Sequence, residues 1–381
     1  MACGAVVVLA VGVVVAMAAL WPGDQTVKDR RGARPVREHE AKVTGVEQVR
    51  CPTPRQRHCA RATATLTEGP NRGRDAAFDA STASEDAAVE IGDRVFLAAN
   101  ELPEGAPTTG VEPYTLTGFQ RHNALLLLTA IFVAFVVVLG RLRGALALVG
   151  LALSLLIVVK FVVPAILDGR APVTVAVVGG LAVMILTILL CHGFGPQSVA
   201  AILGTSASLS LTAGLAAAFI ELANISGISS EESQLVLAGR EDLSLNGLIL
   251  AGMVIGALGV LDDLTVSQAS AVMALRRASP SSGWRALYRE ALTVGRDHVA
   301  ATVNTLVLAY VGAALPVLLI ISVAGTTLGE AANIEEIAQE IVATLVGSIG
   351  LIVAVPITTA LAAVLAARLP RGRLPQSAHA H

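Results

Sequence analysis

The chain has 381 residues, of which 54% are hydrophobic and only 15% are charged. Soluble domains carry about 25% charged residues, and a mean hydropathy of +0.70 is too apolar for a soluble globular protein. The 27 basic and 29 acidic side chains nearly cancel, which argues against a basic nucleic-acid-binding protein and against an acidic solvating tail. The composition therefore predicts a polytopic membrane protein.

Eight stretches are long and apolar enough to cross a bilayer as helices, which takes about 20 residues each. They are Cys3–Trp21, Ala124–Gly140, Ala145–Leu167, Val173–Leu190, Val199–Ile220, Leu245–Leu261, Ala300–Val323 and Ile341–Ala366. None shows the short alternating pattern of a membrane β-strand. We therefore expect an all-α polytopic membrane helical bundle of about eight transmembrane helices.

The basic residues of the short loops predict the orientation, because Lys and Arg accumulate on the cytoplasmic side. With both termini in the cytoplasm, the inner segments hold ten arginines: Arg141, Arg143, Arg276, Arg277, Arg285, Arg289, Arg296, Arg368, Arg371 and Arg373. The short outer loops hold Arg170 and Arg240 and are otherwise acidic. The first stretch has a signal-peptide-like Ala16–Ala18, but it lacks a positive n-region, which favours an uncleaved helix.

Residues 22–120 form a polar region between the first two predicted helices, and we expect an extracytoplasmic β-rich domain there with about five short strands. Ala60–Leu66 and Val89–Ala98 alternate in polarity, with a turn at Gly92–Asp93. Asp24–Arg37 and Leu102–Pro113 read as linkers. The predicted division is 1–21 for the N-terminal transmembrane helix, 22–120 for the exported region, 121–369 for a seven-helix membrane core and 370–381 for a cytoplasmic tail.

Two of the four cysteines, Cys51 and Cys59, lie in the exported region. A disulfide between them is favoured over free thiols in an oxidising compartment. A metal site with His39 and His58 fits less well, because the spacing suits no compact site. We expect neither a metal nor a cofactor.

Lys160 is a charged residue inside an apolar stretch, eight residues before Asp168 and so about 12 Å along the helix. One interpretation is a pathway or coupling residue paired with a carboxylate, because intramembrane charges are costly and normally face the bundle interior. The other is a lysine that extends its side chain to the membrane surface. Both interpretations of Lys160, as a coupling residue and as a lysine that reaches the membrane surface, are consistent with the sequence.

The sixth predicted helix carries a regular glycine pattern. Gly252, Gly256, Gly259 and Asp263 share one face at helical spacing, which predicts close packing against another helix. Asp262 points about 100° away from that face, while Ser267 and Ser270 stay on the side of Asp263. The functional interpretation is a vestibule for a cation or proton, and the alternative is an ordinary pair of interfacial carboxylates.

Other polar residues of the bundle are interpreted mainly as structural. The hydroxyls between Thr205 and Thr212 favour small-residue packing with bonds to i−4 carbonyls. Pro316 and Pro356 predict kinks. On the seventh predicted helix, His298 shares a face with Thr305, Gly312 and Pro316, and Asn304 lies off that face by about 100°.

Catalytic motifs are absent from the sequence. It contains no G-x-x-x-x-G-K-[ST], no H-E-x-x-H, no C-x-x-C and no G-x-S-x-G. We therefore expect no catalytic residues.

Three long segments resemble the YibE/F family of multi-pass bacterial membrane proteins. They are Gly256–Ala271 (GALGVLDDLTVSQASA), Gly295–Pro316 (GRDHVAATVNTLVLAYVGAALP) and Glu340–Thr359 (EIVATLVGSIGLIVAVPITT), with weaker support from Lys160–Gly169. The resemblance covers roughly residues 123–368. It implies an integral protein of the bacterial plasma membrane with an exported N-terminal part and a helical core, and it implies no catalytic residues.

The leading functional hypothesis is a secondary transporter or permease that moves an unknown ion or small molecule. Its transport or coupling candidates are Lys160, Asp262, Asp263, Ser267, Gln268, Ser270, His298 and Asn304. The alternative is a non-transporting scaffold or signalling protein that uses its exported domain. An intramembrane enzyme is the third and weakest hypothesis. The expected partners are the lipid bilayer and a second copy or another membrane protein, with no nucleic acid.

Overall fold

The computed structural model describes residues 2–23, 38–49, 59–69, 71–81, 88–100, 114–228 and 244–369. Two compact units are defined by their internal contacts. One consists of Met1–Val27 with Leu139–His381, and the other is Lys28–Val138. The two predicted linkers, Cys51 and residues 370–381 lie outside the described residues.

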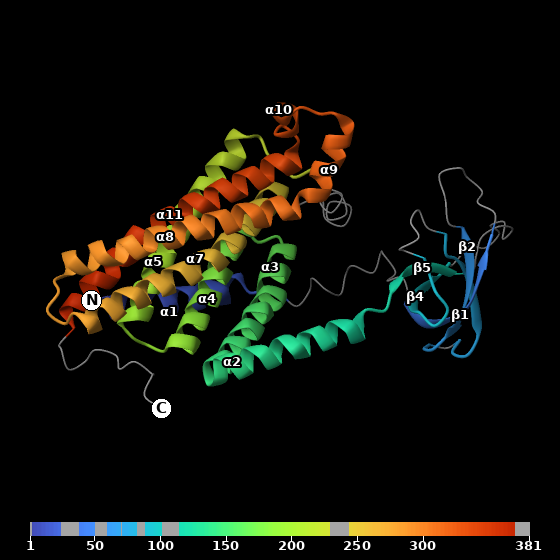
Figure 1. The fold of residues 1–381 in the computed structure, drawn as a ribbon, viewed down its shortest axis with the longest axis horizontal. Coiled ribbons are helices and arrows are strands. Elements are labelled where there is room, and N and C mark those ends of the chain that lie inside the picture. Colours follow the sequence, from blue (N-terminus) through green and yellow to red (C-terminus); the bar gives the residue numbers. More distant parts are fainter. Residues whose placement is uncertain are drawn as a thin grey trace. The chain divides into compact units, whose positions relative to one another are not determined.

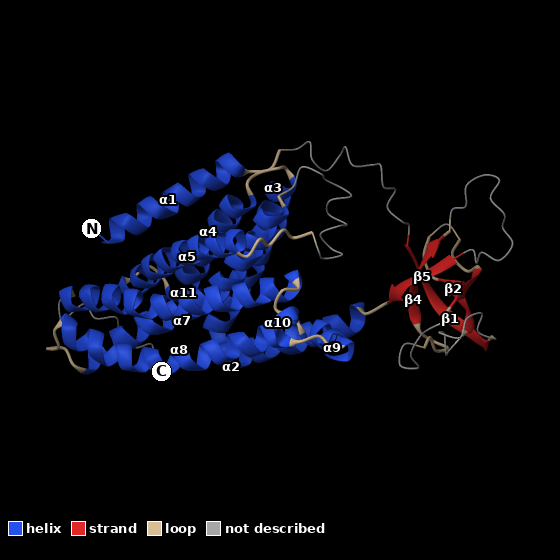
Figure 2. Cartoon of the chain, turned by 90° about the horizontal axis from the view of Figure 1, so that it is seen from above, coloured by secondary structure: helices blue, strands red, loops and turns tan. Residues whose placement is uncertain are grey.

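The second unit contains a five-stranded closed barrel (Figure 2, red) with the order β1-β2-β3-β5-β4. The strands are β1 (Glu38–Gln48), β2 (Ala60–Leu66), β3 (Asp75–Asp79), β4 (Arg94–Ala99) and β5 (Tyr114–Phe119). The pair β3–β5 is parallel and the other four pairs are antiparallel, which is the topology of an OB-fold barrel. Alternate residues such as Ala62, Phe78 and Leu97 fill its core. The prediction of a small β domain is confirmed.

The remaining elements are helices (Figure 1). They are α1 (Ala2–Leu20), α2 (His122–Ile157), the π-helical turn η2 (Val158–Val162), α3 (Val163–Leu167), α4 (Pro172–His192), α5 (Pro196–Leu222), α7 (Leu245–Ala278), α8 (Trp284–Ala313), α9 (Leu315–Ala324), α10 (Leu328–Ala331) and α11 (Glu335–Arg368).

Six helices among the described residues are long and apolar enough to cross a membrane, or seven if the bent pair α8–α9 is one span. The predicted number of eight is not reproduced, because two predicted spans fall within the single 46-residue run His122–Leu167. At 1.5 Å per residue this run is about 69 Å long, more than twice the thickness of the hydrocarbon core. It is not straight, since Arg141 has φ 49° and ψ −133° and interrupts the helical geometry.

Three long helices, α5, α7 and α11, pack against one another and form the centre of the helical unit. α4 packs on α5 and α7, α8 on α7 and α11, and α1 on α4 and α5. The far end of α1 is held by two contacts. The Trp21 ring stacks on Phe161 of η2 with centroids 5.7 Å apart, and the Gly23 amide donates to Asp168 Oδ2 at 3.3 Å.

The interface between α5 and α11 depends on small residues. A Cβ added at Gly204 would collide with Thr358, and one added at Gly350 would collide with Thr212. The hydroxyls of Ser206, Ser210 and Thr212 donate to the carbonyls four residues earlier, at 2.7–2.8 Å. The predicted small-residue packing of this helix is what the structure shows.

The glycine face of α7 was predicted to pack closely against another helix, and the structure leaves it open. Gly252, Gly256 and Gly259 are exposed, and a Cβ at Gly252 or Gly259 would meet nothing within 4 Å. No helix backbone among the described residues approaches this face. The reason is that α8 approaches α7 closely further along, where Gly295 lies against the Gln268 side chain.

The two prolines act differently. The chain bends by 61° between α8 and α9, and Pro316 lies at the start of α9, so the bend lies next to the residue where a kink was predicted. Pro356 lies inside α11, which continues from Glu335 to Arg368. The predicted kink at Pro356 does not interrupt that helix.

Candidate functional site

A short segment of α7, Asp262–Ser270, extends polar side chains to four other helices. The Thr265 and Thr205 hydroxyls lie 2.5 Å apart and join α7 to α5. The amide nitrogen of Gln197, in the first turn of α5, donates to Ser270 Oγ at 2.5 Å. We call these residues and their partners the polar belt.

Gln268 extends the polar belt to α8 and α11. Its side chain is only 3% exposed, and its Nε2 donates to the Ala291 carbonyl and to Thr359 Oγ1, both at 2.8 Å. Thr359 in turn donates to the Val355 carbonyl at 2.6 Å. Each donor of the buried amide therefore has an acceptor, as buried polar groups require.

Asp262 is the exception in the polar belt. Its Oδ2 lies 3.5 Å from the Thr187 hydroxyl of α4, and that hydroxyl donates at shorter distances to the carbonyls of Val183 and Met184. Its Oδ1 is buried and has no hydrogen-bond partner among the residues that the structure describes. A buried carboxylate oxygen without a partner is costly, so the site suits a ligand: a proton, a cation or water.

Two titratable groups interact electrostatically with the Asp262 carboxylate. The neighbouring Asp263 acts on it electrostatically and adds negative charge, while Asp263 itself is exposed. The Cys191 thiol of α4 lies within electrostatic range of the Asp262 carboxylate. No group of three or more His, Cys, Asp or Glu side chains that could hold a metal ion occurs in the described part of the chain.

The other predicted candidates lie outside the polar belt. Lys160 lies in η2, is exposed and forms no ion pair with any described residue, so the structure does not show the pairing with a carboxylate that one of its two interpretations required. His298 and Asn304 are exposed on α8, and Ser267 is half-buried. Cys59 is buried and disulfide-bonded, and its predicted partner Cys51 lies outside the described residues.

Five residues of interest were not among the predicted candidates: Thr187, Gln197, Tyr310, Glu340 and Thr359. Thr187, Gln197 and Thr359 stand in apolar helices without a distinguishing local pattern, and only the packing of the helices shows that they meet α7. Glu340 follows Glu335, Glu336 and Gln339 in the polar first turns of α11, so nothing in the local sequence distinguishes it from its neighbours.

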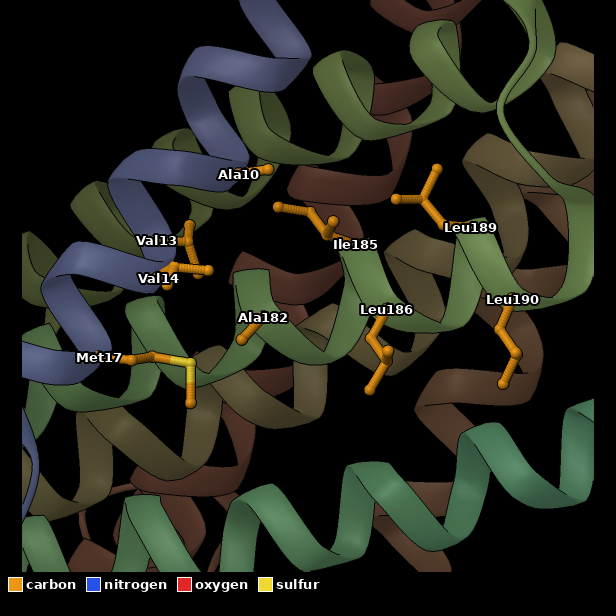
Figure 3. A pocket seen from close by; sticks show the side chains of 9 residues that line it. All are labelled: Ala10, Val13, Val14, Met17, Ala182, Ile185, Leu186, Leu189 and Leu190. Carbon is orange, nitrogen blue, oxygen red and sulfur yellow. The ribbon is translucent and has the colours of Figure 1, made fainter.

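A cavity of about 510 Å³ lies between α1 and α4 (Figure 3). Its lining residues are Ala10, Val13, Val14, Met17, Ala182, Ile185, Leu186, Leu189 and Leu190. All of these side chains are apolar. The cavity therefore offers no side-chain group that could hold an ion or orient a polar substrate, and it is not the candidate site.

Several apolar helices packed around a polar centre define a multi-pass helical membrane protein. The profile of the family described as YibE/F-like protein matches residues 128–368, and the chain belongs to this family. The matched region contains the whole of the polar belt. Searches of the curated proteins and of the solved structures give no significant match to this chain.

Proposed function

We propose that this YibE/F-like protein is a secondary transporter or permease of the bacterial plasma membrane, in which Asp262 carries the coupling proton or cation. The observation that carries the proposal is the buried Asp262 Oδ1, which has no partner among the described residues and lies where α7 meets α4. Intramembrane ionisable residues of this kind mark ion pathways and proton relays.

The proposed topology has eight spans and both termini in the cytoplasm. The interruption at Arg141 coincides with the basic pair Arg141 and Arg143, which the positive-inside rule assigns to a cytoplasmic turn. The run His122–Leu167 then counts as two spans and residues 22–120 are exported. In this topology the polar belt lies in the cytoplasmic half of the bundle, because Gln197 is near the cytoplasmic start of α5.

The belt bonds are suited to a moving interface. They join α7 to its neighbours through hydroxyl and amide groups, and interhelical hydrogen bonds in membranes average only about 0.6 kcal/mol. Rocking of α7 against α4 and α5 would break three such contacts, those with Thr187, Gln197 and Thr205. Occupation of Asp262 by a proton or cation would remove the uncompensated charge, and this would permit the site to pass between the two sides.

A second candidate function is a membrane scaffold or signalling protein. The observation that favours it is the barrel, which belongs to a compact unit of its own. In this alternative the exported barrel binds a partner, or a second copy of the chain, and the helices act as its anchor.

The transport proposal is tested with proteoliposomes on a solid-supported membrane, exposed to sudden changes of pH or Na⁺. We expect the wild type to give transient currents and Asp262→Asn to give currents at the level of empty liposomes, because the site loses its charge. Asp263→Asn removes the adjacent exposed charge and is expected to reduce the currents less. Equal currents from the wild type and Asp262→Asn would contradict the proposal and favour the scaffold.

A further inference from the structure

A second polar site lies between α7, α8 and α11, away from the polar belt. Two cavities, of about 300 and 340 Å³, meet there, and Tyr310 and Glu340 line both of them. Their sizes are at the lower end of the 300–1,000 Å³ that is typical of small-molecule sites. The two side chains therefore lie at the boundary of a divided pocket.

Glu340 is a carboxylate with one oxygen that lacks a hydrogen bond and an ion pair among the described residues. Its Oε2 is buried and has no hydrogen-bond partner within the described ranges, and no described Lys or Arg forms an ion pair with it. Buried carboxylate oxygens are normally hydrogen-bonded or paired with a charge. A cationic ligand would supply the missing partner.

The open glycine face of α7 provides the room for a ligand. Gly252 lines one of the cavities, and a Cβ added there would meet nothing within 4 Å. A Cβ at Gly256 would lie 3.4 Å from the Tyr310 hydroxyl, so Tyr310 packs over the next turn of α7. Any larger residue at these positions would fill the space that the glycines leave.

We propose that Glu340 and Tyr310 form a binding site for a small organic cation with one positive charge and an apolar body. One carboxylate matches one positive charge, and the Tyr310 ring can hold an ammonium group by a cation–π contact. Most of the other lining residues, which include Leu248, Met253 and Val311, are apolar. An inorganic cation such as Ca²⁺ needs six to eight oxygen ligands, and besides Glu340 and Tyr310 the polar side chains of the two linings are only Gln339 and Thr344.

The proposal does not depend on transport, and it is tested by binding to the full chain purified in detergent. The probe is benzyltrimethylammonium, observed by saturation-transfer NMR, with neopentylbenzene as its neutral carbon isostere. We expect saturable binding of the cation that the neutral analogue does not displace. Glu340→Gln is expected to weaken binding about 30-fold or more, because a buried charge pair is lost.

Two further variants serve as a control for charge and as a block of the cavity. Glu336→Gln removes a carboxylate one turn away that lines neither cavity, and it should bind the probe like the wild type. Gly252→Leu places a side chain in one cavity, and its Cβ would meet no atom within 4 Å, so it should block binding while size-exclusion behaviour stays unchanged. Absence of saturable binding, or equal affinity of the wild type and Glu340→Gln, would overturn the proposal. Displacement of the cation by the neutral isostere would overturn it too, because it would assign the site to apolar molecules.

Discussion

Replacing Asp262 by leucine is expected to make the helical unit more stable while it abolishes function. The buried Oδ1 has no partner in the described structure, and the burial of an unsatisfied polar group costs about 1–3 kcal/mol. The substitution removes this cost, so the midpoint of thermal unfolding should rise. Natural proteins retain such costs at functional sites, where activity requires them.

The matched control is Asp168→Leu. The Asp168 carboxylate accepts the Gly23 amide at 3.3 Å, so its removal breaks a contact and should lower the midpoint or leave it unchanged. Both variants are measured by differential scanning fluorimetry in the same detergent. A marked loss of stability in Asp262→Leu would show that the carboxylate supports the fold, and the interpretation as a ligand site would then be wrong.

Gly350→Ala is expected to destabilise the helical unit, and Thr212→Ala is expected to rescue it. The new methyl group would collide with Thr212 Oγ1, but it would lie at an ordinary 3.4 Å from Thr212 Cβ. Overpacking of this kind costs about 1–3 kcal/mol. Removal of the hydroxyl relieves the collision, so the double variant should unfold close to the wild-type temperature.

For Gly204, the other glycine of this interface, we expect that truncation of the facing threonine does not restore stability. A methyl group at Gly204 would lie 3.0 Å from Thr358 Cβ and 3.2 Å from its Cα. Because a backbone atom cannot move as easily as a hydroxyl, Thr358→Ala should not restore Gly204→Ala. Equal rescue at both sites, or none at Gly350, would mean that α5 and α11 do not pack as the structure shows.

The sequence predicts a secondary-structure element best where the alternation of neighbouring residues, or the chemistry of a single residue, determines the backbone conformation. The alternation of Ala60–Leu66 matches β2 residue for residue, because one face of the strand fills the barrel. The break before Pro316 follows from the ring of proline, which removes a backbone donor. The basic pair Arg141 and Arg143 predicted a turn within the run His122–Leu167, and the helical geometry is interrupted at Arg141, but the sequence did not predict that the helix continues directly on both sides of it.

The candidate site was predictable only in part. The carboxylates of α7 stand out in an apolar helix, and Asp262 lies in the polar belt as a half-buried residue with a buried Oδ1. The glycine face next to them shows where a helix could approach, but α8 approaches further along at Gly295. Thr187 and Gln197 join the polar belt through contacts 75 and 73 residues apart in sequence, and a single sequence does not encode such pairs in any local pattern.

The central claim, that a cation or proton reaches Asp262 from the cytoplasmic end of the bundle, is tested most directly through Cys191. Among the described residues, the free cysteines are Cys3 and Cys191, so Cys3→Ala leaves Cys191 as the reporter, and Cys191→Ala gives the background. Its rate of modification is measured in inside-out and right-side-out vesicles with a cationic methanethiosulfonate and with a neutral one. We expect the cationic reagent to react from the cytoplasmic side, and the ratio of its rate to that of the neutral reagent to fall roughly tenfold in Asp262→Asn, because a negative site concentrates cations. The ratio is compared because loss of the nearby charge changes the reactivity of the thiol toward both reagents alike. A Cys191 thiol that reacts from neither side, or equally in both proteins with both reagents, would contradict the claim.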